Sequence, residues 1–443
     1  MAMLLVLSMV PASAMSVFAT ETFDTENFKG LVLTTTVSGL SKGKHYFRVA
    51  AVDKVNGKYQ AGSASGKITV TVKASAVPAK TDTSKTEKPA QTTTVEKANG
   101  SSLPIAKAMG NGWNLGNTME SVAGWLGAGS TANDFERAWG QPITTEDMIK
   151  GVKNAGFDSV RIPVAWSNMI SNDGTYTISD KYFERVDEIA GYVLENDMYC
   201  IINIHWDGGW WSSFGSSDEK TQEETMKRYK AMWKQIAEHY SDYSEKLIFE
   251  SANEELGSAT KGSSSMAESY ERVNTINQTF VDLVRSTGGK NKTRPLLIAG
   301  YDTDIAKTAD SRFKMPKDSA KGKLLVSVHY YSPSTFCIAD NENNSWGYKD
   351  SWGTDSDIAA MKKDFEKLKR FTDAGYGVVI GEYGVAKKKS GSSYSTKKGT
   401  DLFFESVVEL SEKYGFCPML WDCSDWYDRR NLRFTESCLS DIY

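Results

Sequence analysis

The sequence has little of several residue types and patterns, and each shortage excludes a class of protein. It has only four His and five Cys in 443 residues, and neither type shows the spacing of a metal site. The Cys content is also too low for a disulfide scaffold. Basic residues do not outnumber acidic ones, because the net charge is −4, so nucleic acid is not expected as a partner. No apolar run has the length that a bilayer requires, so we expect no membrane as a partner. Because His and Cys show no metal-site spacing, we also expect no metal, and we expect no cofactor.

Apolar and aromatic residues are plentiful. The chain is 40% hydrophobic and contains 12 Trp, 20 Tyr and 18 Phe. This composition suffices for at least one large buried core and excludes a disordered, collagen-like or coiled-coil protein.

The first residues have the composition of a secretory leader. Residues 1–19 are apolar and then small, and Ala12 to Ala14 and Val17 to Ala19 both fit the small-residue rule for signal cleavage. The usual positive start is absent, so the natural start is expected further upstream. The alternative interpretation of residues 1–19 is a buried N-terminal strand. We expect a signal peptide and an extracellular protein.

Two further segments precede the main domain. Residues 20–73 alternate as short strands do, and they resemble the second half of a fibronectin type III domain, although a complete sandwich needs about 90–100 residues. Residues 74–102 are rich in Thr, Lys, Ser and Pro and cannot bury enough apolar surface to order themselves. We expect a partial accessory module and a flexible linker, and a domain at 103–443 that acts without them.

Residues 103–443 alternate between short apolar runs and helix-like segments. The apolar runs fall at residues 112–115, 159–164, 199–204, 246–249, 295–298, 324–328, 377–380 and 417–421. Amphipathic segments of helical period fall at 144–155, 180–196, 222–240, 266–286, 357–374 and 398–414. Apolar strands that alternate with helices indicate a parallel sheet with a covered outer face. Eight such units predict an α/β fold, a (β/α)8 TIM barrel with a short final helix. A doubly wound sheet is disfavoured, because GWNLGN at 112–117 is not the glycine-rich G-x-G-x-x-G turn.

Polar and aromatic residues follow the predicted strands. In a barrel of this kind the active site forms at the carboxyl ends of the strands. The residues found in or just after the strands are Arg161, His205, Asn253, Glu254, His329, Tyr331, Glu382 and Trp421. A barrel without chemistry would favour small or apolar residues there. The pattern therefore predicts a catalytic cup.

Two carboxylates form the centre of this cup. Glu254 follows the fourth predicted strand and Glu382 the seventh, so both face one barrel mouth. Either alone could be a salt bridge at the rim. Together they fit glycoside hydrolysis with retention, which needs two carboxyl groups about 5–5.5 Å apart.

Seven motifs in order along this region resemble one family. They are GWNLGN at 112–117, VRIPV at 160–164, INIH at 202–205, FESANE at 249–254, VHYY at 328–331, GEYG at 381–384 and LWD at 420–422. The region resembles glycoside hydrolase family 5, retaining β-glycanases that include many bacterial endoglucanases. The motifs span the whole domain, and any one of them alone would be a weak signal.

The resemblance implies a role for each matched residue. Glu254 would be the acid/base and Glu382 the nucleophile. The supporting residues would be Arg161, His205, Asn253, His329 and Tyr331, and the sugar-binding residues Trp421, Trp206, Trp210 and Asn117. Arg161 would keep Glu382 ionised. Because like charges raise each other's pKa, Glu254 is expected to stay protonated beside an anionic Glu382.

Two departures from the family pattern stand out. Glu255 follows Glu254 where many relatives have Pro, and Trp206 follows His205 where many endoglucanase relatives have a second His. The loop that continues through Trp210 and Trp211 is expected to contact sugar near the cleavage point. Other aromatic residues are equally compatible with sugar subsites and with the core; they are Trp139, Trp166, Trp346, Trp352 and Trp426.

These observations predict a secreted, monomeric endo-β-1,4-glucanase that acts on cellulose or a related β-glucan. A hydrolase of mixed-linkage β-glucan, xyloglucan, xylan or mannan is an alternative with the same catalytic set. A non-catalytic carbohydrate-binding barrel is an alternative of another class, which the presence of both glutamates disfavours.

Overall fold

The structure is a computed structural model that describes residues 95–443, apart from 128, together with the backbone of five strands between residues 2 and 72. Contacts divide the chain into two units, Met1–Ala90 and Gln91–Tyr443. The first unit is antiparallel, with strand order β2-β1-β3-β4 and β5 beside β3. Its strands are β1 (Ala2–Val10), β2 (Val17–Thr22), β3 (Gly43–Val55), β4 (Lys58–Ala64) and β5 (Ile68–Val72).

The expectations for the N-terminal region are only partly covered by these strands. The predicted leader at 1–19 coincides with β1 and the start of β2, and β1 pairs with β3. Residues 23–42 and 73–94, where parts of the predicted fibronectin-like module and most of the predicted linker fall, lie outside the described residues. Signal cleavage and the fibronectin resemblance stay predictions.

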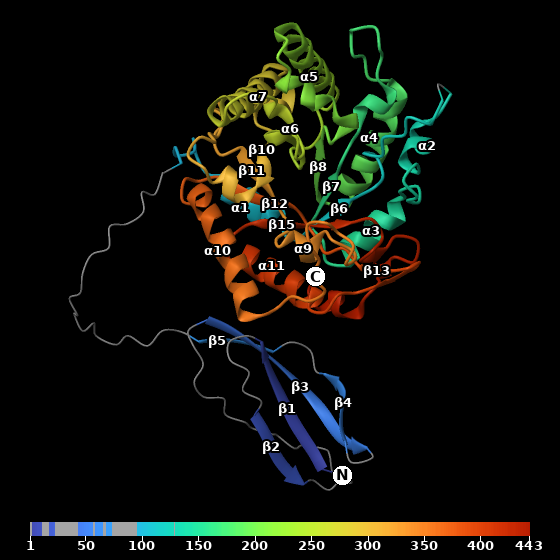
Figure 1. The fold of residues 1–443 in the computed structure, drawn as a ribbon, viewed down its shortest axis with the longest axis vertical. Helices are drawn as coiled ribbons and strands as arrows, with labels where there is room; N and C mark the ends of the chain where they lie inside the picture. Colours follow the sequence, from blue (N-terminus) through green and yellow to red (C-terminus); the bar gives the residue numbers. More distant parts are fainter. Residues whose placement is uncertain are drawn as a thin grey trace, which may run out of the picture. The chain divides into compact units, whose positions relative to one another are not determined.

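The second unit is a closed barrel of eight parallel strands, which confirms the predicted fold (Figure 1). The strands in chain order are β6 (Gly112–Leu115), β7 (Ser159–Ile162), β8 (Tyr199–Asn203), β9 (Leu247–Glu250), β10 (Leu296–Asp304), β11 (Leu324–Tyr330), β12 (Gly377–Tyr383) and β15 (Cys417–Asp422). Each strand pairs with its neighbours in sequence, and β15 pairs with β6 to close the barrel. All eight predicted strands are present.

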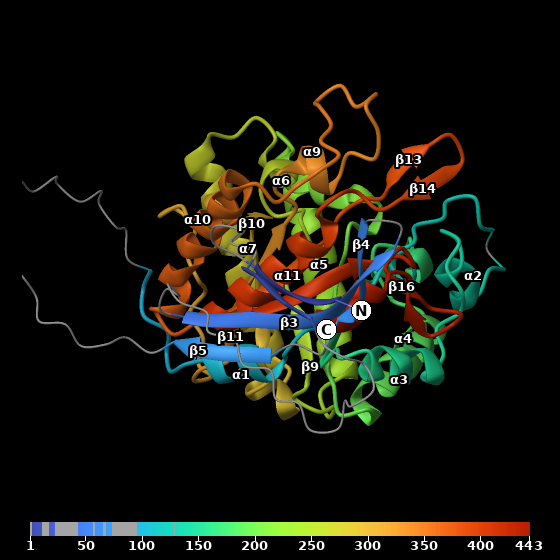
Figure 2. The same cartoon turned by 90° about the horizontal axis from the view of Figure 1, so that it is seen from below.

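Helices cover the outside of the barrel (Figures 1 and 2). The long ones are α3 (Glu146–Asn154), α4 (Asp180–Glu195), α5 (Glu219–His239), α7 (Met266–Ser286), α10 (Asp355–Thr372) and α11 (Thr400–Tyr414). Between β10 and β11 there is only the single turn α8 (Ile305–Thr308), and the chain ends in the short 3-10 helix η4 (Ser437–Asp441). No helix of the described residues is long and apolar enough to cross a membrane.

The register of the strands sets polar residues side by side near the carboxyl ends. The cross-strand pairs are Asn114 with Arg161, Asn203 with Glu250 and His329 with Glu382. The amino end of the barrel is apolar instead, because Ile201, Ile248 and Leu297 pack there on Ala106 and Met109 from helix α1 (Leu103–Ala108) and the residue after it. One end is thus a sealed core, and the other carries the polar groups.

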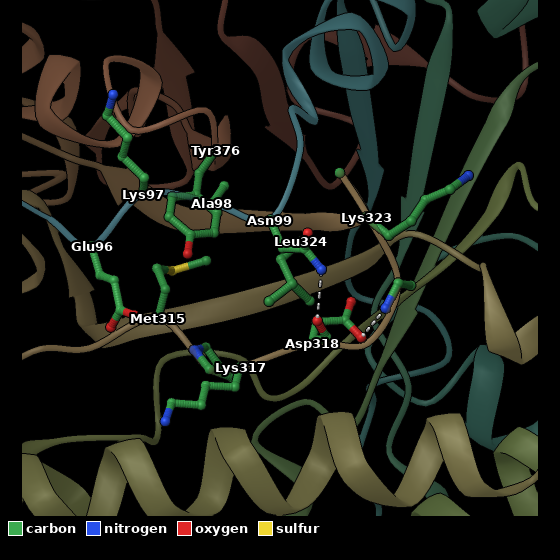
Figure 3. A pocket seen from close by; sticks show the side chains of 13 residues that line it. Glu96, Lys97, Ala98, Asn99, Met315, Lys317, Asp318, Lys323, Leu324 and Tyr376 are labelled. Atoms are coloured by element: carbon green, nitrogen blue, oxygen red, sulfur yellow. Dashed lines mark hydrogen bonds between the residues drawn. The ribbon is translucent and has the colours of Figure 1, made fainter.

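The last residues of the predicted linker belong to the barrel unit. The Ser102 hydroxyl accepts a hydrogen bond from the Gly377 amide at 2.7 Å and donates to the Leu324 carbonyl. The Ala98 amide donates to the Ala374 carbonyl at 2.8 Å. Figure 3 shows the adjoining pocket of about 180 Å³, which is lined in part by residues 96–99 and lies at the amino ends of β11 and β12. The ordered barrel therefore starts before residue 103.

This boundary can be tested by two truncations. Removing residues 1–90 should leave the free energy of unfolding of the barrel unchanged within about 0.5 kcal/mol. Removing residues 1–102 should lower it by about 2–4 kcal/mol, because several hydrogen bonds of about 1 kcal/mol each are lost. Urea unfolding followed by circular dichroism measures both. Equal stability of the two truncated chains would show that residues 91–102 contribute nothing to the barrel.

Candidate active site

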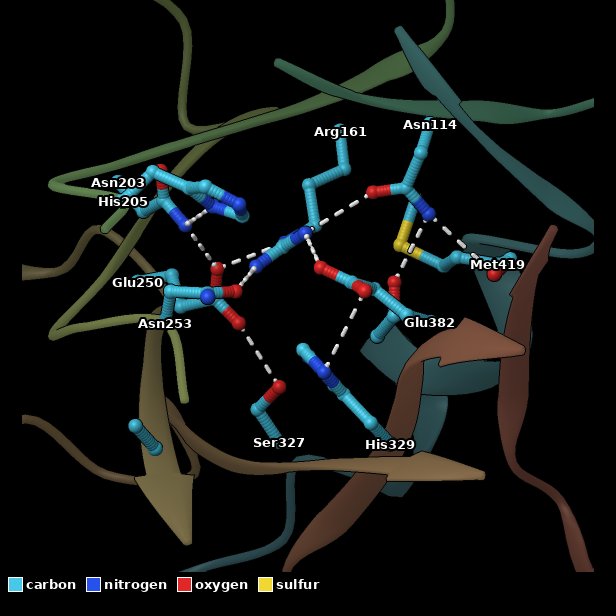
Figure 4. A network of polar contacts seen from close by, with 12 residues as sticks. Asn114, Arg161, Asn203, His205, Glu250, Asn253, Ser327, His329, Glu382 and Met419 are labelled. Carbon is cyan, nitrogen blue, oxygen red and sulfur yellow. Dashed lines mark hydrogen bonds and ion pairs between the residues drawn. The ribbon is translucent and has the colours of Figure 1, made fainter. Parts of the chain in front are cut away.

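Arg161 on β7 lies at the centre of the polar network at the carboxyl end of the barrel (Figure 4). Its side chain is fully buried and donates to Glu250 and Glu382 at 2.7 Å each. It also donates to the side-chain oxygens of Asn253 at 2.8 Å and Asn114 at 3.0 Å. Burial lowers the pKa of Arg161, but the two carboxylates outweigh it and raise this pKa further above its usual value. Arg161 is therefore a permanent cation that orients its neighbours.

Glu382 at the end of β12 is held by several of the predicted residues. Besides the bond from Arg161, its carboxylate accepts one from the Tyr331 hydroxyl at 3.0 Å, and His329 Nδ1 lies 3.6 Å away. Burial raises the pKa of Glu382, and the charges of His329 and Arg161 act against this shift. Burial and the nearby carboxylate also raise the pKa of Tyr331 well above its usual value, so Tyr331 remains a hydrogen-bond donor.

Glu254 approaches the same nitrogen of His329 as Glu382 does. Its Oε1 lies 2.7 Å from His329 Nδ1, and 48% of its side chain is exposed, against 8% for Glu382. Although burial raises the pKa of Glu254, the hydrogen bond and charge of His329 outweigh it and lower this pKa. The pKa of His329 is lowered by burial but raised more strongly by the two glutamates.

The expected order of the two carboxyl pKa values is therefore wrong for the substrate-free protein. Glu254 has the lowered pKa and Glu382 the raised one. The expectation rested on the repulsion between the two acids and on the charge of Arg161 beside Glu382. It left out His329, which bonds the more exposed acid, and the burial of Glu382.

The two carboxylates are close together. One oxygen of Glu254, Nδ1 of His329 and one oxygen of Glu382 all lie within 4.8 Å of one another. Such a group could hold a cation, and it is the one cluster of three or more metal-ligating side chains among the described residues. Because all three side chains belong to the polar network itself, we assign no separate metal centre.

His205 and Trp421 form another part of the site. Their rings are nearly parallel, with an interplanar angle of 9° and centroids 6.1 Å apart. Burial, followed by the charges of Arg161 and His329, lowers the pKa of His205 well below its usual value, so its ring is neutral near pH 7. The half-buried Asn117 lies in the turn after β6, where its backbone N–H donates to the Glu120 carboxylate.

The structure separates the remaining aromatic candidates. In the loop after β8, Trp206 is 47% exposed, Trp210 is half-buried and Trp211 is fully buried. Of the five tryptophans that fitted either a sugar subsite or the core, Trp139 and Trp346 are exposed. The other three, Trp166, Trp352 and Trp426, are buried in the core.

A buried second layer of the site was not predicted from the sequence. Glu250 accepts hydrogen bonds from Arg161, from the Asn203 amide at 2.9 Å and from the Ser327 hydroxyl at 2.8 Å. Asn114 accepts from Arg161 and donates to the Gly381 carbonyl at 2.9 Å. The available signal was a glutamate inside an otherwise apolar strand, because such a charge must be paired when it is buried.

Glu255 also points into the protein. Only 7% of it is exposed, and its Oε1 accepts a hydrogen bond from the Asn253 amide at 3.3 Å. Burial raises its pKa to about 8, and the charges of Glu254 and Glu382 act in the same direction. Near pH 7 Glu255 is therefore a neutral carboxylic acid, which the residue type alone did not reveal.

Replacing Glu255 by Gln should change how stability depends on pH. The folded pKa of about 8 exceeds the usual 4.5, so the neutral acid contributes stability that is complete below about pH 4.5 and lost as the pH rises through 8. Between pH 5 and pH 9 the unchanged protein should lose about 2–4 kcal/mol of unfolding free energy relative to Glu255→Gln. Urea unfolding at both pH values measures this. Glu271→Gln, at an exposed position of α7, is the control and should follow the unchanged protein, whereas parallel curves for Glu255→Gln would contradict the prediction.

Comparison with known proteins identifies the family. The family model "Cellulase (glycosyl hydrolase family 5)" matches residues 121–426. A xyloglucan-specific endo-beta-1,4-glucanase of Bacteroides ovatus is 34% identical over 333 residues, which cover 72% of this chain and 64% of that protein. Endoglucanase A of Paenibacillus barcinonensis is 34% identical over 341 residues, which cover 72% of this chain and 81% of the relative.

A solved structure has the same fold. It is a GH5-4 broad specificity endoglucanase from Ruminococcus champanellensis with bound cellotriose, 30% identical, with a TM-score of 0.67 over 79% of this chain and 99% of that one. The chain spans slightly less than two thirds of the Bacteroides ovatus protein. The family match covers most of the barrel, including both central glutamates. The chain therefore belongs to the cellulase family, glycosyl hydrolase family 5, and its barrel is a glycoside hydrolase domain.

Proposed function

We propose that this glycoside hydrolase is an endo-β-1,4-glucanase that cleaves internal β-1,4-glucosidic bonds with retention of configuration. The observation that carries the proposal is the separation of the two acids. Oxygens of Glu254 and Glu382 lie within 4.8 Å of each other. Retaining enzymes place their carboxyl groups about 5–5.5 Å apart, whereas inverting enzymes need about 6.5–9.5 Å to admit a water.

In the first step Glu382 attacks the anomeric carbon, and Glu254 gives its proton to the leaving oxygen. Arg161 and Tyr331 hold the attacking carboxylate in place through hydrogen bonds of 2.7 and 3.0 Å. The raised pKa of Glu382 does not prevent attack, because Arg161 favours its ionised form. A sugar that covers the half-exposed Glu254 removes water from it and raises its pKa, so the acid takes up its proton as the substrate binds.

In the second step Glu254 acts as a base. It removes a proton from water, which attacks the covalent glycosyl-enzyme and releases Glu382. His329, which lies 2.7 Å from Glu254 and 3.6 Å from Glu382, stabilises whichever of the two is ionised. Asn253, fixed by Arg161 and Glu255, is placed to bond the sugar 2-hydroxyl.

The names of the relatives support a β-glucan substrate. One is described as xyloglucan-specific and another as a broad specificity endoglucanase with cellotriose bound. Trp421 at the barrel mouth, beside His205, offers a flat apolar face on which a sugar ring can stack. Mixed-linkage β-glucan, xyloglucan, xylan and mannan are the competing substrates within the family.

A panel of purified polysaccharides tests this proposal. We expect new reducing ends and a rapid fall in viscosity with carboxymethylcellulose, because internal cuts shorten the chains early. Greater activity on xylan or mannan than on carboxymethylcellulose would contradict the proposed substrate. Binding without any release of reducing ends would instead favour a non-catalytic carbohydrate-binding barrel.

We propose that the protein acts outside the cell as a monomer. Residues 1–19 fit a cleaved leader, and the net charge of −4 includes no excess of basic residues that would favour nucleic acid as a partner. Edman sequencing of the protein recovered from the culture medium should give a start shortly after residue 14 or 19. Light scattering should give the mass of one chain.

A further inference from the structure

Asp207 lies at the start of the loop after β8, in the 3-10 segment η2 (Asp207–Gly215). It is 1% exposed, and its backbone has a positive φ of 51°. Its carboxylate accepts hydrogen bonds from the Ser167 amide at 2.8 Å, the Ser167 hydroxyl at 2.6 Å and the Trp210 indole nitrogen at 2.7 Å. One buried acid thus joins the loop after β8 to η1 (Trp166–Met169), which follows β7.

Helix α5 adds a third element to this cluster. The Arg228 guanidinium lies 4.7 Å from the centroid of the Trp210 ring and donates to the Ser167 hydroxyl. Arg228 and the buried Tyr182 are the other titratable groups that interact electrostatically with Asp207. The three donors to Asp207 need an acceptor, and an ionised carboxylate only accepts.

This cluster supports an exposed tryptophan. Trp211 stacks on Trp210 with ring centroids 4.4 Å apart, and its indole nitrogen donates to the His205 carbonyl at 2.9 Å. Trp206 immediately follows His205, and it lies against Gly209, where an added Cβ would come within 3.2 Å of the Trp206 indole nitrogen. The indoles of Trp210 and Trp211 therefore hold the loop, while that of Trp206, the residue directly after His205, is 47% exposed.

We propose that Asp207 is a positioning residue which, in its ionised form, fixes this loop so that Trp206 presents a sugar-stacking face to the part of a β-glucan chain that extends beyond the cleaved bond. The inference deepens the proposed function and rests on it. Asp207 itself touches no substrate. It acts through Trp206, and it thereby determines how tightly a β-glucan chain longer than the reacting sugar is held.

The hydrogen bonds from Ser167 and Trp210 to Asp207, called the clamp below, should depend on pH. Burial raises the pKa of Asp207 to about 6, while Ser167, Trp210 and Arg228 act against this shift. Above pH 6 the ionised carboxylate accepts all three hydrogen bonds. Below pH 6 this arrangement is lost, because the protonated carboxyl adds a fourth donor to the three that already point at it. Asp207→Asn has too many donors at every pH, because an NH2 group replaces one acceptor oxygen, and Asn tolerates the positive φ.

Steady-state kinetics on two substrates test this role. For cellohexaose, Asp207→Asn should raise KM about tenfold and leave kcat within about twofold, because one ring-stacking contact is weakened. For a small aryl β-glycoside, which does not reach Trp206, both constants should stay unchanged. The KM of the unchanged protein for cellohexaose should rise below pH 6, and that of Asp207→Asn should not.

A double-mutant comparison shows whether Asp207 acts through Trp206. Asp207→Asn should add less than a twofold effect to Trp206→Ala. Asp173→Asn is the matched control, because Asp173 also accepts bonds from Ser171 and Thr175 but lies in an exposed loop. A full effect of Asp207→Asn in the Trp206→Ala background, or an equal loss on the aryl glycoside, would overturn the proposal.

Calorimetric binding of cellohexaose to the same variants, each also carrying Glu382→Ala, gives the comparison without turnover. We expect Asp207→Asn to raise the Kd about tenfold, in line with its effect on KM, and Asp173→Asn to leave the Kd unchanged. If the unchanged protein hydrolyses no β-glucan while the Glu382→Ala variants show this ratio of Kd values, the proposed function is contradicted and the proposed role of Asp207 stands. Equal Kd values with and without Asp207→Asn would refute the clamp.

Discussion

Replacing Glu382 by Ala should lower kcat on β-glucan by about 10⁴- to 10⁶-fold, as the loss of a nucleophile does in other hydrolases. Without this carboxylate no covalent intermediate can form. Azide should restore some turnover of an activated aryl glycoside and give a product of inverted α configuration, because azide then attacks the substrate directly. Circular dichroism should show a folded barrel.

Glu254→Ala should behave differently. Activity on polysaccharide should fall by about 10²- to 10⁴-fold, the range for loss of a general acid. An aryl glycoside whose leaving group needs no proton should still react and then stall at the glycosyl-enzyme. Azide should release it as a product of retained β configuration.

A trapped intermediate distinguishes the two roles directly. A 2-fluoro-substituted activated glycoside should label the unchanged protein, and peptide mass spectrometry should locate the ester on Glu382. An ester on Glu254, or an α product from Glu254→Ala with azide, would reverse the assignment.

Replacing Glu250 by Ala should reduce both stability and activity. Arg161 would lose one of its two carboxylate partners, and the amide of Asn203 and hydroxyl of Ser327 would lose an acceptor. Breaking one side of a buried ion pair costs about 3–5 kcal/mol of unfolding free energy. Because Arg161 also positions Glu382 and Asn253, kcat/KM should fall by about 10²-fold, the effect of a displacement near 1 Å.

Another buried ion pair provides the control. Glu136 on α2 (Ala132–Glu136) bonds Arg185 on α4 at 2.8 Å, outside the polar network of the barrel mouth. Glu136→Ala should lower stability by a similar amount and leave kcat/KM within about twofold once the protein is folded. Urea unfolding and activity at 25 °C separate the two effects. Equal activity losses in Glu136→Ala and Glu250→Ala would show that Glu250 acts only through stability.

Much of the barrel could be predicted because its signals are local. The barrel strands are short, mostly apolar runs, and each long helix has an amphipathic period, so the eight strands and six long helices are visible without tertiary contacts. Asn253-Glu254 and Glu382 were found because they stand where an apolar run ends. No amphipathic segment was assigned between β10 and β11, and the structure has only the turn α8 there, which is too short to show a period in the sequence.

The sequence by itself determined the barrel, the family and the residues at the strand ends, since these depend on residue type and order along one segment. Only the tertiary structure decided the electrostatics. Glu250 pairs with an arginine 89 positions away, and His329 reaches Glu254 across 75 positions. Burial and the approach of charges from distant strands set the pKa values of Glu254, Glu255 and Glu382. These shifts depend on distances that arise only when the barrel closes.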